Sequence, residues 1–80
     1  MPEGVQAYIM IMTSSEGTEP MLKRLRDDPS VEEAHIVYGD VDIIAKVNVE
    51  SLTSLTAFIM KLRRNPEVKK TNTLIVLLEP

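Results

Sequence analysis

The 80-residue sequence has no cysteine and no tryptophan, and it has only one histidine and three glycines. Without cysteine, the chain can form neither a disulfide framework nor a metal site built on thiolates. A chain of this length buries only a modest hydrophobic core. We therefore expect one domain, residues 1–80, whose stability is supplemented by homo-oligomerisation.

Excess positive charge and long apolar runs are missing as well. Nine Lys and Arg face twelve Asp and Glu, a formal net charge of −3, whereas binding to a phosphate backbone depends on cationic side chains. We therefore expect no direct DNA binding, and we interpret the basic cluster at 61–70 as cations near a helix end. Residues 1–4 lack the basic and apolar regions of a signal peptide, and no apolar run could span a bilayer. These features predict a cytoplasmic protein without membrane association.

Groups that carry out catalysis are scarce. A Ser-His-Asp arrangement would depend on His35 alone, and the position of His35 within a strand, beside Glu32 and Glu33, is more typical of a solvated or interface residue. One histidine and scattered carboxylates make a weak metal site. The three glycines are too far apart to form a phosphate-binding loop. The sequence predicts no catalytic residue, no metal and no cofactor.

Hydrophobic periodicity predicts six elements. The apolar patterns indicate strands over 5–12, 31–38, 41–49 and 68–78. A helix capped by Thr18 ends at Asp28-Pro29, and a second helix capped by Ser51 ends at Asn65-Pro66. The second helix is expected to bury Leu52, Leu55, Ile59 and Leu62, and the first to bury Met21, Leu22 and Leu25.

The order of these elements, βαββαβ, predicts a ferredoxin-like α+β sandwich, an antiparallel sheet with both helices on one face. An internal repeat supports it, because residues 25–33 align without gaps with residues 62–70. Strands one, two and four are expected to carry apolar residues on both faces, among them Tyr8, Met10 and Met12. Since two helices cover only one face, we predict a dimer joined sheet to sheet.

The segment between the second and third strands is the best candidate for a binding site. Tyr38, Gly39, Asp40 and Asp42 lie in this segment. Glycine lets a ligand carboxylate approach backbone amides, and the Asp42 carboxylate offers a partner for an ammonium group. These two demands together describe a free α-amino acid. The alternative interpretation is an ordinary hairpin with a solvated aspartate.

The last strand offers a second polar group. Thr71 and Thr73 are two residues apart, so their hydroxyls project from the same face of the strand, with Asn72 on the other face. Threonine is also common in strands for purely structural reasons. This pair alone is therefore weak evidence for a binding site.

The chain as a whole resembles the ligand-sensing (RAM) domain of the Lrp/AsnC family of transcriptional regulators. The resemblance depends on the element order, the Pro-x-Val junctions at Pro29 and Pro66, the stretch 37–47 and the stretch 71–77. The family's helix-turn-helix DNA-binding domain has no counterpart here. We therefore expect the stand-alone form of the domain.

The resemblance implies an amino-acid sensor and not an enzyme. It implies dimers joined through their sheets that close into octameric or decameric rings, with small effectors bound where dimers meet. Tyr38, Gly39 and Asp42 match the effector-contact segment, with Asp40 between them, and Thr71 and Thr73 match positions that approach it from a neighbour. Full-length regulators of the same family are implied as further partners.

Two other functions are compatible with the fold. Dimeric ferredoxin-like barrels include monooxygenase-like enzymes, for which only His35 and Tyr38 are candidates in this sequence. A purely structural oligomerisation module that binds no ligand is the other alternative.

Overall fold

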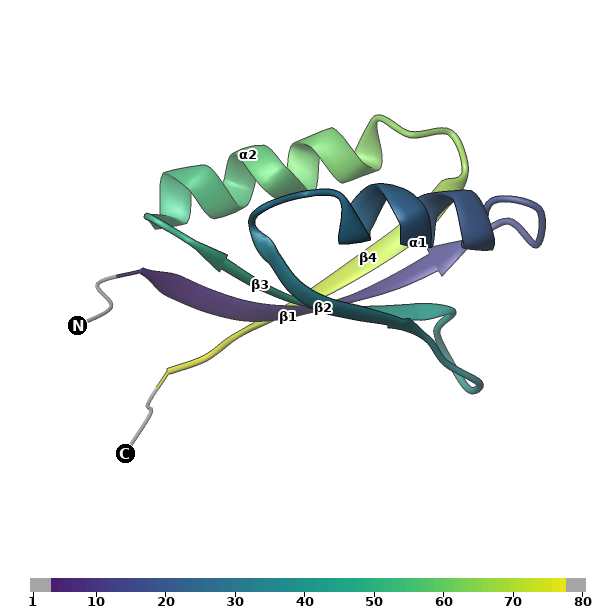
Figure 1. The fold of residues 1–80 in the computed structure, drawn as a ribbon, viewed down its shortest axis with the longest axis horizontal. Coiled ribbons are helices and arrows are strands. Elements are labelled where there is room, and N and C mark those ends of the chain that lie inside the picture. Colours follow the sequence, from purple (N-terminus) through teal and green to yellow (C-terminus); the bar gives the residue numbers. More distant parts are fainter. Residues whose placement is uncertain (1–3, 78–80) are drawn as a thin grey trace.

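The computed structural model describes residues 4–77. The elements follow one another as β1 (Val5–Thr13), α1 (Thr18–Arg26), β2 (Val31–Ile36), β3 (Ile43–Val49), α2 (Leu52–Arg63) and β4 (Val68–Ile75). The strands pair antiparallel in the order β2-β3-β1-β4, and both helices lie on the same face of the sheet (Figure 1). The predicted ferredoxin-like α+β fold is confirmed.

The core lies between the sheet and the helices. Alternate residues of the two central strands point toward the helices, and Ile9, Ile11, Ile43 and Val47 are the largest side chains buried there. The helices add Met21, Leu25, Leu55, Phe58 and Leu62. The expected stripe on α2 was wrong at one end, because Leu52 is 59% exposed and Phe58 is buried instead. Residues 55, 58 and 62 share the helical face that points to the sheet.

The two predicted helix caps have different outcomes. Ser51 caps α2 as expected, with its hydroxyl oxygen accepting a hydrogen bond from the Ser54 N–H at 3.1 Å. The prediction for Thr18 was wrong by one position, because Gly17 is the N-cap of α1 and makes no side-chain cap bond. The Thr18 hydroxyl instead lies 2.6 Å from the Thr13 hydroxyl and bonds the Ser14 carbonyl at 3.2 Å. It therefore ties the start of α1 to the end of β1.

The repeat seen in the sequence is reproduced in the hydrogen bonds of the two helix-to-strand junctions. Asp28 Oδ1 accepts the Ser30 N–H at 2.9 Å, and Asn65 Oδ1 accepts the Glu67 N–H at 2.8 Å. At each junction the first residue of the next strand donates its N–H at 3.0 Å to the carbonyl of that same Asp or Asn. The two halves of the chain therefore turn from helix to strand in the same way.

Strand ends differ from the predicted bounds. β2 ends at Ile36 and β3 begins at Ile43, so residues 37–42 form a loop longer than the expected hairpin turn. A hydrogen bond from the Val37 N–H to the Asp42 carbonyl at 2.9 Å closes this loop. β4 ends at Ile75, and the predicted end of that strand, Leu78, lies outside the described residues.

The face of the sheet away from the helices, here called the open face, consists of Gln6, Tyr8, Met10, Met12, Glu33, His35, Ile44, Lys46, Asn48, Lys70, Asn72 and Leu74. The expected apolar character holds for β1 and for Leu74 of β4. It was wrong for β2, where Glu33 and His35 occupy this face. A bulge between Val31 and Glu33 shifts the register and turns all the apolar residues of β2 toward the helices.

Candidate functional site

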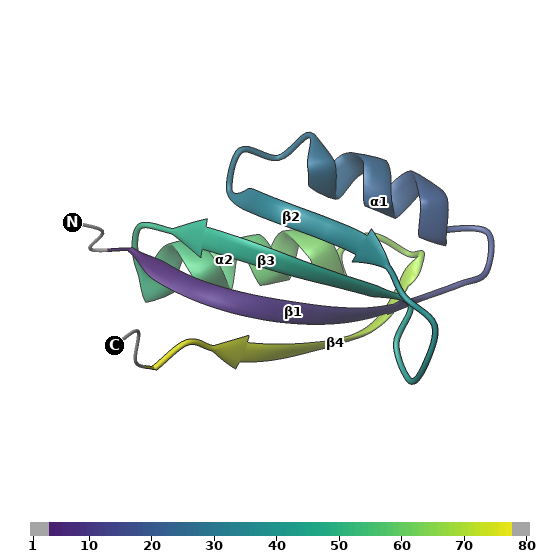
Figure 2. The same cartoon turned by 60° about the horizontal axis from the view of Figure 1, so that its bottom comes forward.

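The loop of residues 37–42 extends beyond the end of the sheet, near the point where β1 ends (Figure 2). The side chain of Tyr38 is fully exposed on it. Gly39 has a φ of +155°, and no atom lies within 4 Å of the place that a Cβ would occupy. Backbone conformation therefore explains the glycine here, and the space beside its backbone is open to a ligand.

Asp42 holds the base of this loop. Its N–H donates to the Ile11 carbonyl at 3.0 Å, and its carboxylate oxygen Oδ2 accepts the Thr13 N–H at 2.9 Å. The half-buried carboxylate thus satisfies a donor at the end of β1, a structural role that the sequence alone did not reveal. An ionised carboxylate has about four acceptor positions, so this bond leaves capacity for an ammonium group.

Thr71 and Thr73 share one face of β4, as predicted, and Asn72 lies on the other. They are opposite Ile11 and Ile9 of β1, which places both threonines on the helix side of the sheet, where they are half-buried. β1 separates them from β3 and the loop. Neighbouring strands lie about 4.8 Å apart, so roughly 10 Å separates the threonine group from the loop group.

The six predicted residues therefore form two separate groups within one chain. Three cavities of 440, 730 and 510 Å³ on the described chain are lined by other residues. None of these three cavities is lined by any of the six predicted residues.

Sequence reasoning missed a polar network on the open face. Lys46 Nζ lies 5.7 Å from the centroid of the Tyr8 ring and 3.6 Å from Glu32 Oε1, and Asn48 donates to Glu32 Oε2 at 3.2 Å. The pKa of the Lys46 ammonium is raised above its ordinary value, mainly by Tyr8 and to a smaller degree by Glu32. The bulge in β2 brings Glu32 to this network, and no signal in the sequence reveals that bulge.

His35 lies on the surface, where its Nε2 is 2.9 Å from Glu33 Oε1 and both side chains are more than half exposed. Within residues 4–77 no three His, Asp or Glu side chains gather into a possible metal site. Neither helix of that part of the chain has the length and apolar character needed to cross a membrane.

The element order and the strand order define the class of the protein, a ferredoxin-like α+β domain with one face of its sheet left uncovered by helices. Residues 6–80 match the Lrp/AsnC ligand binding domain, and the chain belongs to this family. The resemblance noted in the sequence is confirmed. A search of curated proteins returned no match.

Three solved structures illustrate the relationship. Hypothetical protein PHS023 from Pyrococcus horikoshii is 38% identical with a TM-score of 0.86, and the match covers 94% of this chain and 92% of that one. AsnC from E. coli is 31% identical with a TM-score of 0.86, covering 98% of this chain and 54% of that one. The transcriptional regulator NMB0573 from Neisseria meningitidis, solved in complex with L-Met, shares the fold with a TM-score of 0.87 at 20% identity, covering 96% of this chain and 52% of that one.

Proposed function

We propose that residues 1–80 form a single amino-acid-sensing domain whose effector binds between dimers and thereby shifts the oligomeric state. The observation that carries this proposal is the match of residues 6–80 to the Lrp/AsnC ligand binding domain. The complex of the more distant NMB0573 with L-Met supports an amino acid as the class of effector. The domain acts in the cytoplasm by binding and not by catalysis.

The open face supports a dimer joined sheet to sheet. Tyr8 is 37% exposed and Leu74 is 54% exposed, while Met10 and Ile44 beside them are half-buried. The register places Tyr8 opposite Leu74 of β4 and Met10 opposite Ile44 of β3, so these four side chains form an apolar cluster of two adjacent pairs across β3, β1 and β4. Contiguous apolar surface of this kind is typical of an interface, and a symmetric dimer covers it in both subunits at once.

The effector site is proposed to use both groups of predicted residues. Tyr38, Gly39, Asp40 and Asp42 come from one dimer, and Thr71 and Thr73 come from its neighbour. Neither group lines any of the three cavities described on the single chain, which supports a site assembled from two copies. The open space beside Gly39 suits an effector carboxylate, and the Asp42 carboxylate suits its ammonium group.

Such a site couples binding to assembly. An effector that contacts two dimers stabilises the associated state relative to the separated one, by its difference in affinity for the two states. We propose octameric or decameric rings as the associated state. Docking of this domain onto full-length regulators of the family would carry the signal to DNA, which the acidic domain itself does not contact.

A ligand-free oligomerisation module is the second candidate, and the apolar cluster of the open face favours it as much as it favours the sensor. The monooxygenase-like alternative has less support. Ile9, Ile11, Ile43 and Val47 fill the space between sheet and helices where a substrate would bind, and His35 is on the surface.

A thermal-shift screen against the common amino acids tests the sensor. At about a hundred times its dissociation constant, a ligand adds about 2.7 kcal/mol of stability. We expect one or a few amino acids to raise the melting temperature of the wild type and to lose this effect in Asp42→Asn. The amide of that variant can still accept the Thr13 N–H, so the loop keeps its anchor while the charge is removed.

Two further variants complete the screen. Glu19→Gln makes the same chemical change at an exposed position of α1 and is expected to keep the full shift. Asp42→Ala removes the Thr13 bond as well and is expected to be less stable by about 1–3 kcal/mol without any ligand. A screen without any shift would favour the ligand-free module, and an equal shift in Asp42→Asn would contradict the ammonium contact.

A further inference from the structure

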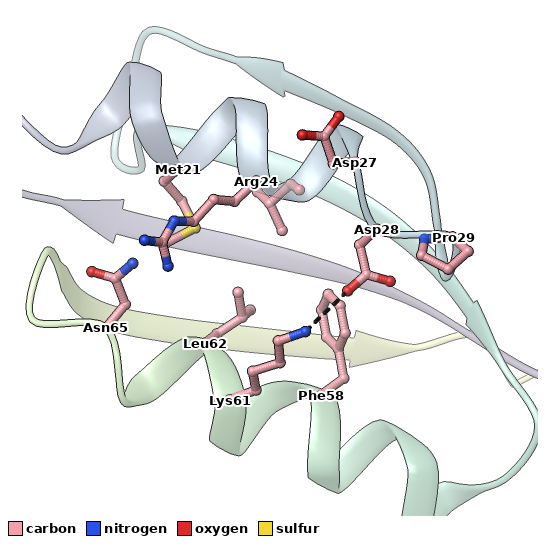
Figure 3. Close-up of a pocket in the computed structure, with 10 residues that line it drawn as sticks. Met21, Arg24, Asp27, Asp28, Pro29, Phe58, Lys61, Leu62 and Asn65 are labelled. Carbon is pink, nitrogen blue, oxygen red and sulfur yellow. Dashed lines mark ion pairs between the residues drawn. The ribbon is translucent and has the colours of Figure 1, made fainter.

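The two helices diverge on the side of the sheet opposite the open face and leave a cavity of about 440 Å³ between them. We call this cavity the helix groove, and Figure 3 shows the side chains that line it. The floor is apolar and consists of Met21 and Leu25 from α1 and Phe58 and Leu62 from α2. The rim of the groove consists of Arg24, Asp27, Asp28, Pro29, Lys61 and Asn65. The volume falls within the usual range for small-molecule sites.

The groove lies where the two halves of the repeat face each other. Extended by one helical turn toward the N-terminus, the gapless alignment pairs Met21 with Phe58, Arg24 with Lys61, Leu25 with Leu62 and Asp28 with Asn65. Each half therefore contributes two apolar residues, one cation and one Asp or Asn. The groove has an approximate twofold symmetry that follows from the repeat.

One substitution breaks this symmetry. At one end, Asp28 uses Oδ1 to accept the Ser30 N–H and presents Oδ2 to Lys61 Nζ at 3.7 Å. At the other end, Asn65 uses Oδ1 to accept the Glu67 N–H. The second side-chain atom of this residue is therefore an amide nitrogen, which donates a hydrogen bond, whereas the second atom of Asp28 is an oxygen, which accepts one. In Figure 3 the guanidinium of Arg24 extends toward this end of the groove. Two donors thus converge where the other half of the molecule has an acceptor.

Arg24 forms no ion pair within residues 4–77. Glu16 and Glu67 line the adjoining cavity together with Arg24 and Arg64, and the Glu67 carboxylate accepts a hydrogen bond from the Ser14 hydroxyl. Because the Arg24 guanidinium has no ion pair among the described residues and the Asn65 amide nitrogen adds a second donor, this end of the groove can bind an added carboxylate in competition with Glu16 and Glu67.

We propose that the helix groove binds a small monocarboxylate with an apolar body, such as an aryl or branched aliphatic acid. The carboxylate takes hydrogen bonds from Arg24 and from the Asn65 amide, and the apolar body lies between the two helices against the small edges of Met21, Leu25, Phe58 and Leu62 that remain exposed. This site shares no residue with the effector site proposed between dimers. It does not depend on that function.

Amide chemical-shift titration with phenylacetate tests this site, with phenylacetamide as the neutral ligand of the same shape. We expect phenylacetate to shift the amide signals of α1, α2 and the two junctions, and to bind at least about tenfold more tightly than phenylacetamide, because a hydrogen bond to a charged group is stronger than a neutral one.

Three variants identify the contact. Arg24→Gln is expected to weaken phenylacetate by about tenfold or more. Asn65→Asp keeps the turn, since Asp28 makes the same bond in the first repeat, and gives Arg24 its own carboxylate, so it should weaken binding to a similar degree. Lys23→Gln, an exposed change on the same helix outside the groove, should bind phenylacetate as the wild type does. Equal affinity for the two ligands, undiminished binding in Arg24→Gln, shifts confined to residues 37–42, or no binding at millimolar phenylacetate would each overturn the proposal.

Discussion

The two faces of β1 differ although their residues alternate along one strand. Ile9 is fully buried under the helices, whereas its neighbour Tyr8 is 37% exposed on the open face. The helix side is completed within the chain, because α1 and α2 cover it with apolar side chains. The open face has an apolar cluster of Tyr8, Met10, Ile44 and Leu74 at its centre, flanked by Lys46 and Asn72, and no helix of residues 4–77 covers it. One face of β1 therefore stabilises the fold, and the other is the face that we propose for assembly.

The two faces also differ in charge. Among the described residues of the core, Thr13 is the only buried side chain that is polar. The open face carries Lys46, Glu33 and Lys70 around its apolar cluster. Apolar contact supplies most of the free energy of association, while charged groups at the border of a patch favour one partner and one orientation. This arrangement supports the proposal that the open face forms the dimer interface.

The largest expected effect is on the free energy of unfolding, and it should differ between Ile9 and Met10, which are neighbours on opposite faces of β1. Ile9→Ala should lower the free energy of unfolding by about 2–5 kcal/mol, the usual cost of a cavity in a packed core. Met10→Ala should act mainly through assembly, so its effect should depend on protein concentration. Urea unfolding at several protein concentrations measures both. A loss of the same size in both variants at every concentration would contradict the difference between the faces.

Met10→Glu tests the open face directly as the dimer interface. A carboxylate buried without a partner in a sheet-to-sheet interface costs several kcal/mol, so the mass in sedimentation should fall to that of the monomer while far-ultraviolet circular dichroism stays unchanged. Lys23→Glu, also a change to glutamate but on the exposed side of α1, should leave the mass unaltered. An unchanged mass in Met10→Glu would exclude the open face as the interface.

The smallest effect concerns the border of the open face. Tyr8 and Glu32 raise the pKa of Lys46, which means that the folded state favours the charged amine. This contribution to stability is present below the ordinary pKa of 10.5 and is lost as the pH rises through the raised value. Tyr8→Phe, and to a smaller degree Glu32→Gln, should lower the pKa of Lys46 in a nuclear magnetic resonance titration.

Glu19→Gln provides the control for that titration, because Glu19 is an exposed residue of α1. A pKa of Lys46 that is the same in all four proteins would show that the network does not act on the lysine. High salt should reduce the differences, since exposed charges are screened.

Much of the fold was predictable because local patterns determine it. The alternation in 43–49 placed β3 and its buried face correctly, and Ser51 is a cap whose geometry depends only on residues three positions away. The Pro-containing junctions were predictable for the same reason. Thr18 and Leu52 were misplaced because nearby residues, Gly17 and Phe58, suit the same local pattern, and only packing distinguishes them.

The sequence predicted which residues belong to the candidate site but not the contacts that they make. The loop with its glycine and its aspartates was found from the sequence, and so was the shared face of Thr71 and Thr73. The anchoring of Thr13 by Asp42 was not, because it joins residues that are far apart in the chain. The helix groove was missed for the same reason, although its two halves were already visible as a repeat.

The amino-acid sequence by itself determined the order of the elements, the composition of the core and the two matching halves, because periodicity, caps and proline act over a few residues. The tertiary structure alone decided which face of β2 is apolar, what Asp42 binds and where Arg24 meets Asn65. Those outcomes depend on a bulge, on strand register and on the angle between helices. Each of these is set by the balance of many contacts between residues distant in sequence.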